Sequence, residues 1–140
     1  MKPWSIIASL ALLSACATAE KEPPPKPFVG TRWEVVLELP LTGGTQPQMR
    51  FGDGRVEGFG GCSLFVARYV QDVVGARAIA IGRIEVDRRL CADASAQAAE
   101  TRVLEVLQAV SSYTITADTM VMAGSAGVLK FRAYSQDAKK

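Results

Sequence analysis

The hydrophobic pattern of this chain switches from a two-residue period to a helical period in one segment, and this limits the folds available to it. Apolar and polar side chains alternate in short stretches up to Val86 and again from Tyr113 onward, as in strands that bury one face. In between, apolar residues recur on one face at helical spacing: Ala99, Val103, Leu104, Leu107 and Val110. The pattern predicts a single domain of seven or eight short strands and one long helix.

The expected strands are bounded by glycine and proline turns. They cover residues 33–39, 49–51, 56–59, 64–70, 78–86, 113–117, 119–123 and 128–133. The helix is expected over residues 93–110, with Asp93 or Ser95 as its N-cap. The fold class predicted from this order is α+β, with an antiparallel sheet curled into a partly closed barrel around the one long helix.

The composition removes most of the common catalytic sites. The chain has no histidine, so a Ser-His-Asp or Cys-His nucleophile and a histidine zinc site cannot be assembled. A net charge of +2 is too small to indicate a nucleic-acid partner. The best carboxylate candidates are Glu85 and Asp87 on one strand face, with Glu57 near a glycine bend. A solvated strand face balanced by nearby arginines explains them better, so we expect no enzymatic activity, cofactor or metal site.

Three large side chains allow both a functional and a structural interpretation. Met120 and Met122 share one face of a predicted strand, where two methionines could belong to a metal or haem site. Trp33 could serve as a stacking platform for a ligand. In all three cases burial in the core is the favoured interpretation.

The first sixteen residues resemble the export signal of a bacterial lipoprotein. A basic start at Lys2 precedes an apolar stretch that is too short to cross a membrane permanently. The sequence Leu13-Ser14-Ala15-Cys16 then matches the lipobox, which implies cleavage after Ala15 and attachment of diacylglycerol to Cys16. We therefore expect a signal peptide over residues 1–15 and a lipid anchor in the membrane. An ordinary signal peptide with an incidental Cys16 is the alternative.

A tether is expected between the anchor and the domain. Residues 16–27 contain the acylated N-terminus and a proline-rich linker, which proline restricts to an extended form. Ala17 follows the cysteine where an Asp would favour the inner membrane under the sorting rule of Gram-negative lipoproteins. The expected location is therefore the cell envelope, at the periplasmic face of the outer membrane. Residues 136–140 are expected to form a polar, frayed tail.

The cysteine count fits the same location. Of three cysteines, Cys16 is assigned to lipid, which leaves Cys62 and Cys91 as an even pair in an oxidising compartment. A structural disulfide is the favoured interpretation. Two free buried thiols remain possible, and so does a redox pair, although redox cysteines normally lie close together in sequence.

The sequence from Val29 to Tyr134 carries several motifs that resemble one family. They are Gly30-Thr31-Arg32-Trp33, the run from Phe51 to Ser63, and Cys91 with Glu100, Leu104 and Leu107 in the predicted helix. Together they resemble the META domain, the HslJ-like family of small bacterial envelope proteins, and place that domain at residues 28–135. Ser63 stands where the family's Gly-Cys-Asn motif has Asn. The resemblance implies an α+β fold and an envelope location, with no established catalytic activity or cofactor.

Two functions are expected on this basis. The first is a non-catalytic, lipid-anchored envelope protein that supports envelope integrity or stress tolerance by binding an unidentified envelope protein or lipid. The second is a pilot-like carrier lipoprotein that holds an acyl chain or a hydrophobic peptide of a secretion or assembly partner. A continuous apolar cavity between the helix of residues 93–110 and the sheet would favour the carrier, whereas a filled core would favour the first function.

Overall fold

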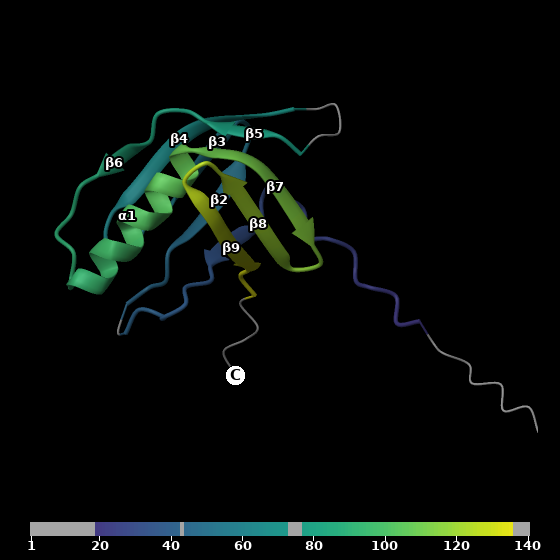
Figure 1. Ribbon diagram of the computed structural model, residues 1–140, viewed down its shortest axis with the longest axis horizontal. Coiled ribbons are helices and arrows are strands. Elements are labelled where there is room, and N and C mark those ends of the chain that lie inside the picture. The colour runs from purple at the N-terminus through teal and green to yellow at the C-terminus, as the bar shows by residue number, and fades with distance from the viewer. Residues whose placement is uncertain (1–18, 43, 73–76, 136–140) are drawn as a thin grey trace, which may run out of the picture.

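The structure is a computed structural model that describes residues 19–42, 44–72 and 77–135. Within these residues the chain forms strands and one helix (Figure 1). The elements are β1 (Arg32–Val35), β2 (Gln48–Gly52), β3 (Arg55–Phe59), β4 (Leu64–Gln71), β5 (Ile79–Ile81), β6 (Glu85–Asp87), α1 (Ala94–Gln108), β7 (Val110–Thr116), β8 (Thr119–Gly124) and β9 (Gly127–Ala133). No helix among the described residues is both long enough and apolar enough to span a membrane.

The strands form one antiparallel sheet that nearly closes on itself. Its order is β5-β4-β3-β2-β1-β9-β8-β7, and β6 pairs separately with β4. The two outer strands β5 and β7 approach each other through a bridge between Ala78 and Ser112. Beside it, the backbone N–H of Tyr113 donates to the Arg77 carbonyl at 3.0 Å. The predicted fold class is therefore confirmed, because short turns pair sequence neighbours and the sheet twist brings its ends together.

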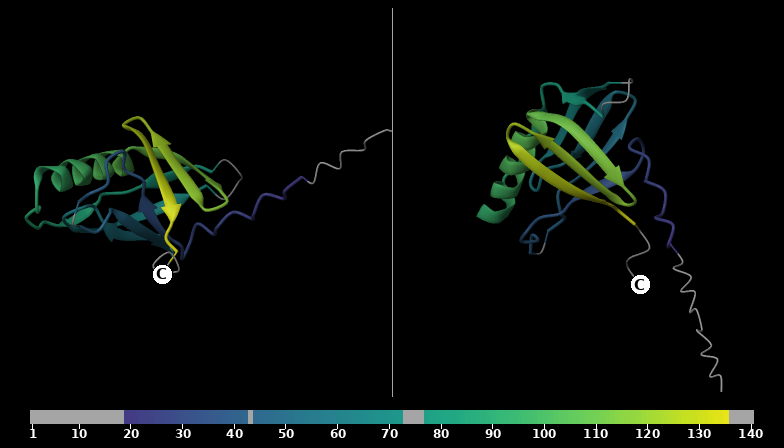
Figure 2. Two further views of the ribbon diagram at one scale, coloured as in Figure 1. Left: turned by 90° about the horizontal axis from the view of Figure 1, so that it is seen from below. Right: turned by 45° about the vertical axis from the view of Figure 1, so that its right-hand side comes forward.

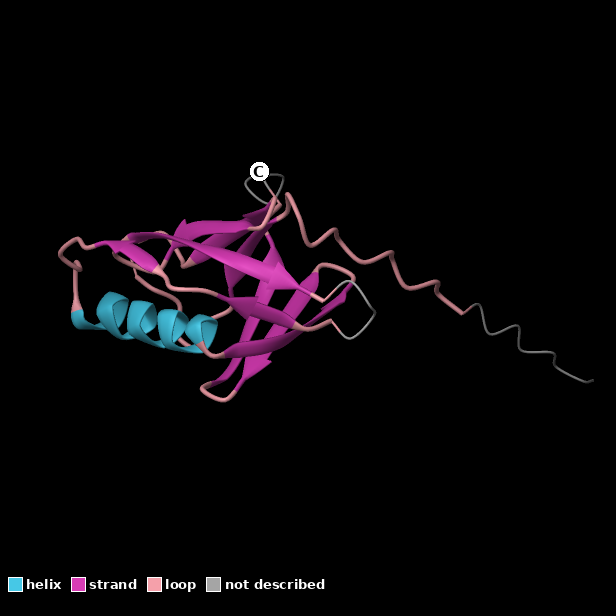
Figure 3. Cartoon of the chain, turned by 90° about the horizontal axis from the view of Figure 1, so that it is seen from above, coloured by secondary structure: helices cyan, strands magenta, loops and turns pink. Residues whose placement is uncertain are grey.

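Helix α1 covers one end of the barrel, as Figures 2 and 3 show. Asp93 is its N-cap, and the Asp93 carboxylate accepts a hydrogen bond from the Ala96 backbone N–H at 2.8 Å. The helix contacts the turns at this end: Arg102 donates to the Ala126 carbonyl after β8 at 2.7 Å, and Gln108 donates to the Gly82 carbonyl after β5 at 3.0 Å. Of the two predicted N-cap candidates, Asp93 is the cap, and Ser95 lies in the first turn of the helix.

The segment that follows the proline-rich linker closes the other end. The ring of Phe28 lies 4.3 Å from that of Phe51 and 4.6 Å from that of Tyr113, measured between centroids. Tyr69 meets Phe28 edge-on at 5.7 Å, and burial raises the pKa of the Tyr69 hydroxyl. The backbone N–H of Lys26 donates to a carbonyl in the β7–β8 turn at 2.7 Å. The chain therefore enters the domain opposite α1 (Figure 1).

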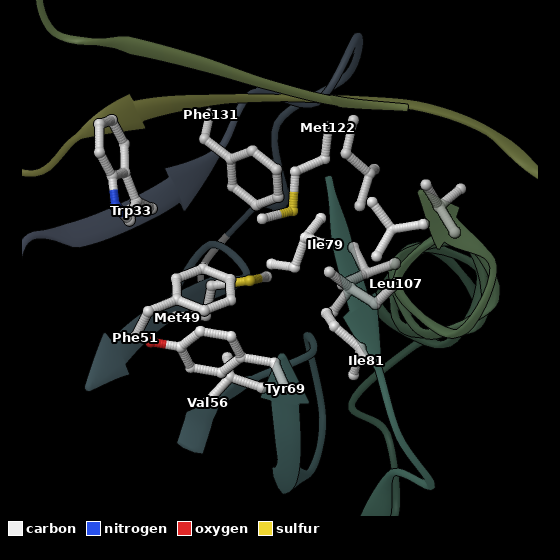
Figure 4. Packing of buried hydrophobic residues seen from close by; sticks show 14 of the residues in the cluster. Trp33, Met49, Phe51, Val56, Tyr69, Ile79, Ile81, Leu107, Met122 and Phe131 are labelled. Atoms are coloured by element: carbon white, nitrogen blue, oxygen red, sulfur yellow. The ribbon is translucent and has the colours of Figure 1, made fainter. Parts of the chain in front are cut away.

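The interior of the barrel is filled with apolar side chains (Figure 4). Trp33, Met120, Met122 and Phe131 have no exposed surface, and α1 adds Val103, Val106 and Leu107, also with none. Trp33 and both methionines are core residues, as predicted. Each buried large apolar side chain contributes about 1.5–3 kcal/mol to stability.

Several predicted elements have different bounds in the structure. The helix expected over 93–110 ends at Gln108, and the strand expected over 113–117 begins at Val110. The strand expected over 33–39 ends at Val35, and Leu39 is 85% exposed. The segment paired with β1 continues beyond Gln48 to Pro47, opposite Val35. Proline has no N–H to extend the ladder of hydrogen bonds. The strand expected over 78–86 is divided into β5 and β6. Both pair with β4, but the register shifts by one residue between Tyr69↔Ile81 and Val66↔Glu85, as in a bulge.

Candidate functional site

Two rows of side chains cross the outer face of strands β1, β2, β3, β4 and β6. The strand register aligns the first row as Arg32, Arg50, Glu57, Val66 and Glu85. The second row, two residues away along each strand, consists of Gln48, Phe59, Leu64 and Asp87. Because residues two apart on a strand share a face, both rows point outward.

A groove of about 700 Å³ lies between the two rows. We call this feature the outer groove and define it by the nine residues of the rows. The row between them contains Met49, Gly58 and Phe65, which pair across β2, β3 and β4. Met49 and Phe65 are 1% and 4% exposed, because their side chains point into the core. Their backbone and Gly58 therefore form the floor of the groove.

The charges in the outer groove are separated by sign. Arg32 and Arg50 are direct cross-strand partners at the β1–β2 end. Glu85 and Asp87 lie at the β6 end, and Glu57 lies on the central strand β3, opposite Arg50. The apolar side chains are in the middle, where Leu64 is 51% exposed.

The basic end of the groove continues around the edge of the barrel. A second depression, of about 610 Å³, also has Arg32 and Arg50 in its wall and adds Lys26 and Tyr134. The Arg32 guanidinium carbon lies 5.5 Å from the centre of the Tyr134 ring, within the range of a cation–π contact. This end therefore presents three cationic side chains, together with the carboxylate of Asp118, to a single surface.

The structure brings the predicted carboxylates into one groove. Glu85 and Asp87 share a face of β6 as predicted, and Glu57 reaches the same groove because β3 and β6 both pair with β4. Asp87 forms an ion pair with Arg89 at 3.1 Å, and both side chains are at least 60% exposed. Exposed carboxylates of this kind can bind a cationic group, but they remain solvated.

Sequence reasoning missed Arg32 and Arg50. Each is an outward residue on its own strand, and nothing in the local pattern separates them from other surface arginines. The signal that identifies them is the register of β1 with β2.

The loop between β3 and β4 is fixed to the segment before α1 by a disulfide and to α1 itself by one carboxylate. Cys62 and Cys91 form a disulfide with an S–S distance of 2.04 Å. The Glu100 carboxylate accepts hydrogen bonds from the backbone N–H groups of Cys62 at 2.9 Å and Ser63 at 2.6 Å. The Ser63 hydroxyl accepts from the Arg89 backbone N–H at 3.1 Å. Ser63, at the family's Asn position, thus has a structural role in this chain.

The same residues form a group with metal-ligand spacing. Ligand atoms of Cys62, Cys91 and Glu100 lie within 4.8 Å of one another. The two sulfur atoms are bonded to each other, however, and the Glu100 carboxylate already accepts two N–H bonds. We therefore interpret these three residues as a structural group that stabilises the fold.

The predicted signal peptide and Cys16 lie outside the described residues.

Comparison with known proteins identifies a family and a fold. The model of the META domain family matches residues 26–136, a range that contains the predicted domain of 28–135. No curated protein matches the chain.

Three solved structures share the fold. One, determined by NMR, is 18% identical with a TM-score of 0.59, over 74% of this chain and 88% of its own. A protein from Burkholderia xenovorans, also determined by NMR, is 15% identical with a TM-score of 0.61, over 97% of this chain and 100% of its own. A DUF4847 family protein from Bacteroides vulgatus is 13% identical with a TM-score of 0.54, over 79% of this chain and 96% of its own. At these identities the likeness is one of fold alone.

Proposed function

Because the chain belongs to the META domain family, we propose that it is a non-catalytic, lipid-anchored envelope protein that binds another envelope component. The outer face of the barrel is the binding surface, and the binding supports envelope integrity or stress tolerance. The anchor is the lipid on Cys16, and the expected location is the periplasmic face of the outer membrane.

The observation that carries this proposal is the filled space between α1 and the sheet. A carrier of an acyl chain or hydrophobic peptide needs an apolar cavity there. Val106 and Leu107 on the helix, and Met122 and Phe131 on the facing strands, have no exposed surface. The described hollows of the molecule, by contrast, open on its outer face and edge. Packing of this kind favours a binding module over a carrier.

Lipid anchoring predicts a specific effect of changing Cys16. Cys16→Ser is expected to abolish incorporation of labelled palmitate and to move the protein from the membrane fraction to the soluble fraction. Two or three acyl chains anchor a protein stably, since each buried methylene contributes about 0.8 kcal/mol. The control is the double variant Cys62→Ser with Cys91→Ser, which should keep the label. Retention of Cys16→Ser in washed membranes, or a wild-type protein without the mass of acyl chains, would refute the anchor.

Binding through the outer face predicts where a partner cross-links. A photo-activated amino acid at Val66, in the middle of the outer groove, should cross-link the anchored protein to an envelope component. The same amino acid at Val121, on β8 outside the groove, is the matched control and should give less product. Equal yields at the two positions would contradict the proposed surface. A stoichiometric lipid or peptide that leaves the purified protein only on unfolding would support the carrier instead.

A further inference from the structure

The charged side chains of the outer groove are not neutralised by one another. Arg50 and Glu57 are direct partners across β2 and β3, yet among the described residues the structure places no ion pair between them. Arg32 and Arg50 face each other as like charges, an arrangement that disfavours the folded sheet. A partner with the opposite charges would remove this repulsion and leave the groove otherwise unchanged.

The spacing of the charges indicates the length of such a partner. The groove crosses five neighbouring strands, from β1 to β6. With about 4.8 Å between neighbouring strands, the arginine end and the β6 end are separated by roughly 19 Å. An extended peptide rises about 3.3 Å per residue, so side chains six positions apart, which share one face of the peptide, are separated by about 20 Å. Phe59, Leu64 and Val66 lie between the two ends, opposite the middle of such a peptide.

We propose that the outer groove binds an extended peptide segment of another envelope protein. The segment carries a carboxylate against Arg32 and Arg50 and a basic side chain against Glu85, with small apolar residues between. This inference rests on the proposed function, because it names the chemistry of the partner for the same surface. An anionic lipid fits less well, since its acyl chain would lie against the carboxylates of Glu57 and Glu85 without pairing them.

The test measures binding of defined peptides to the full chain in detergent solution by fluorescence anisotropy. The probe is the labelled peptide Lys-Thr-Val-Ala-Val-Thr-Glu, whose first and last side chains share one face of an extended chain. It is blocked at both termini so that its side chains carry its charges. The comparison peptide has the same composition with Lys and Glu adjacent. We expect the first peptide to bind at least about fivefold more tightly, because it can reach both charged ends. Equal affinities, or no saturable binding of either peptide, would overturn the proposal.

Charge-reversal variants distinguish binding in the groove from non-specific attraction to the charge of the whole protein. The double variant Arg32→Glu with Arg50→Glu should bind the probe at least about fivefold more weakly. Binding should return with a probe that has Lys at both ends. The matched control is Arg55→Glu with Arg68→Glu, a second cross-strand arginine pair on the same sheet that does not line the groove. Equal losses in the two double variants would overturn the proposal.

A further arm distinguishes this inference from the proposed function. Vesicles containing an anionic phospholipid are tested in place of the peptide. If the vesicles bind through Arg32 and Arg50 and the peptides do not, the peptide proposal is wrong. The cross-link from Val66 would then still test whether an envelope component binds this face, and lipidation of Cys16 would still test the anchor. The two proposals can therefore fail separately.

Discussion

Glu100→Ala is expected to lower the free energy of unfolding by about 2–4 kcal/mol. The Glu100 carboxylate accepts the backbone N–H groups of Cys62 and Ser63, at 2.9 and 2.6 Å, from residues more than 35 positions away. Ser63 is 2% exposed, so its donor has little access to water once the acceptor is removed. A buried donor without a partner costs about 1–3 kcal/mol. Urea unfolding followed by circular dichroism measures the change.

The loop has little freedom to compensate for this loss. Gly61 has a φ of +132°, and a Cβ atom placed there would lie 2.9 Å from the Ala96 carbonyl oxygen in the first turns of α1. A Cβ atom on Gly60 would lie 2.9 Å from Cγ of Glu100. The loop backbone therefore packs directly on the helix. A shift that restored hydrogen bonding to water would have to separate the two.

Two further variants make the Glu100 prediction specific. Both N–H groups donate to the same oxygen, Oε2 of Glu100. Glu100→Gln can keep this acceptor and removes only its charge, so it should lose about half as much stability as the alanine variant. Glu105→Ala changes an exposed carboxylate on the same helix and should shift stability by less than about 0.5 kcal/mol. If Glu100→Ala were as mild as Glu105→Ala, the two N–H bonds would not contribute as described.

Loss of the disulfide is expected to have an effect of similar or larger size. Cys62 and Cys91 are separated by 29 positions, and closing a loop of that length contributes about 3–4 kcal/mol on the chain-entropy model. The loop contains β4, β5 and β6, so its closure also holds β6 near the start of β4. Cys62→Ser and Cys91→Ser should each lower stability by about this amount.

The double serine variant provides the control for the bridge. It should be no less stable than either single variant, because the bond is already lost in each of them. Thiol titration of the unreduced, unfolded wild type should detect no reactive group from this pair. A double-variant loss equal to the sum of two independent losses would contradict the disulfide. Because Glu100 also acts on Cys62, its variant and Cys91→Ser should not be additive.

The local sequence pattern predicts some residues of the outer groove and not others. Glu85 and Asp87 were placed on one face by the two-residue period, and the structure keeps them there. The break between β5 and β6 was not predicted, because a continuous alternation through residues 78–86 contains no sign of a register shift. Arg32 and Arg50 were missed for a related reason: a like-charge pair exists only after two strands have been aligned.

Residue order alone determined the properties that depend on near neighbours. These are the strand faces, the helix with its two N-cap candidates, the turns and the class of fold, because periodicity and capping act within a few positions. The tertiary structure decided which strands align, where the sheet closes at Ala78 and Ser112, and that Glu100 reaches the loop of Cys62. These contacts join residues far apart in the chain. Their partners are selected by packing of the whole barrel, which no local pattern records.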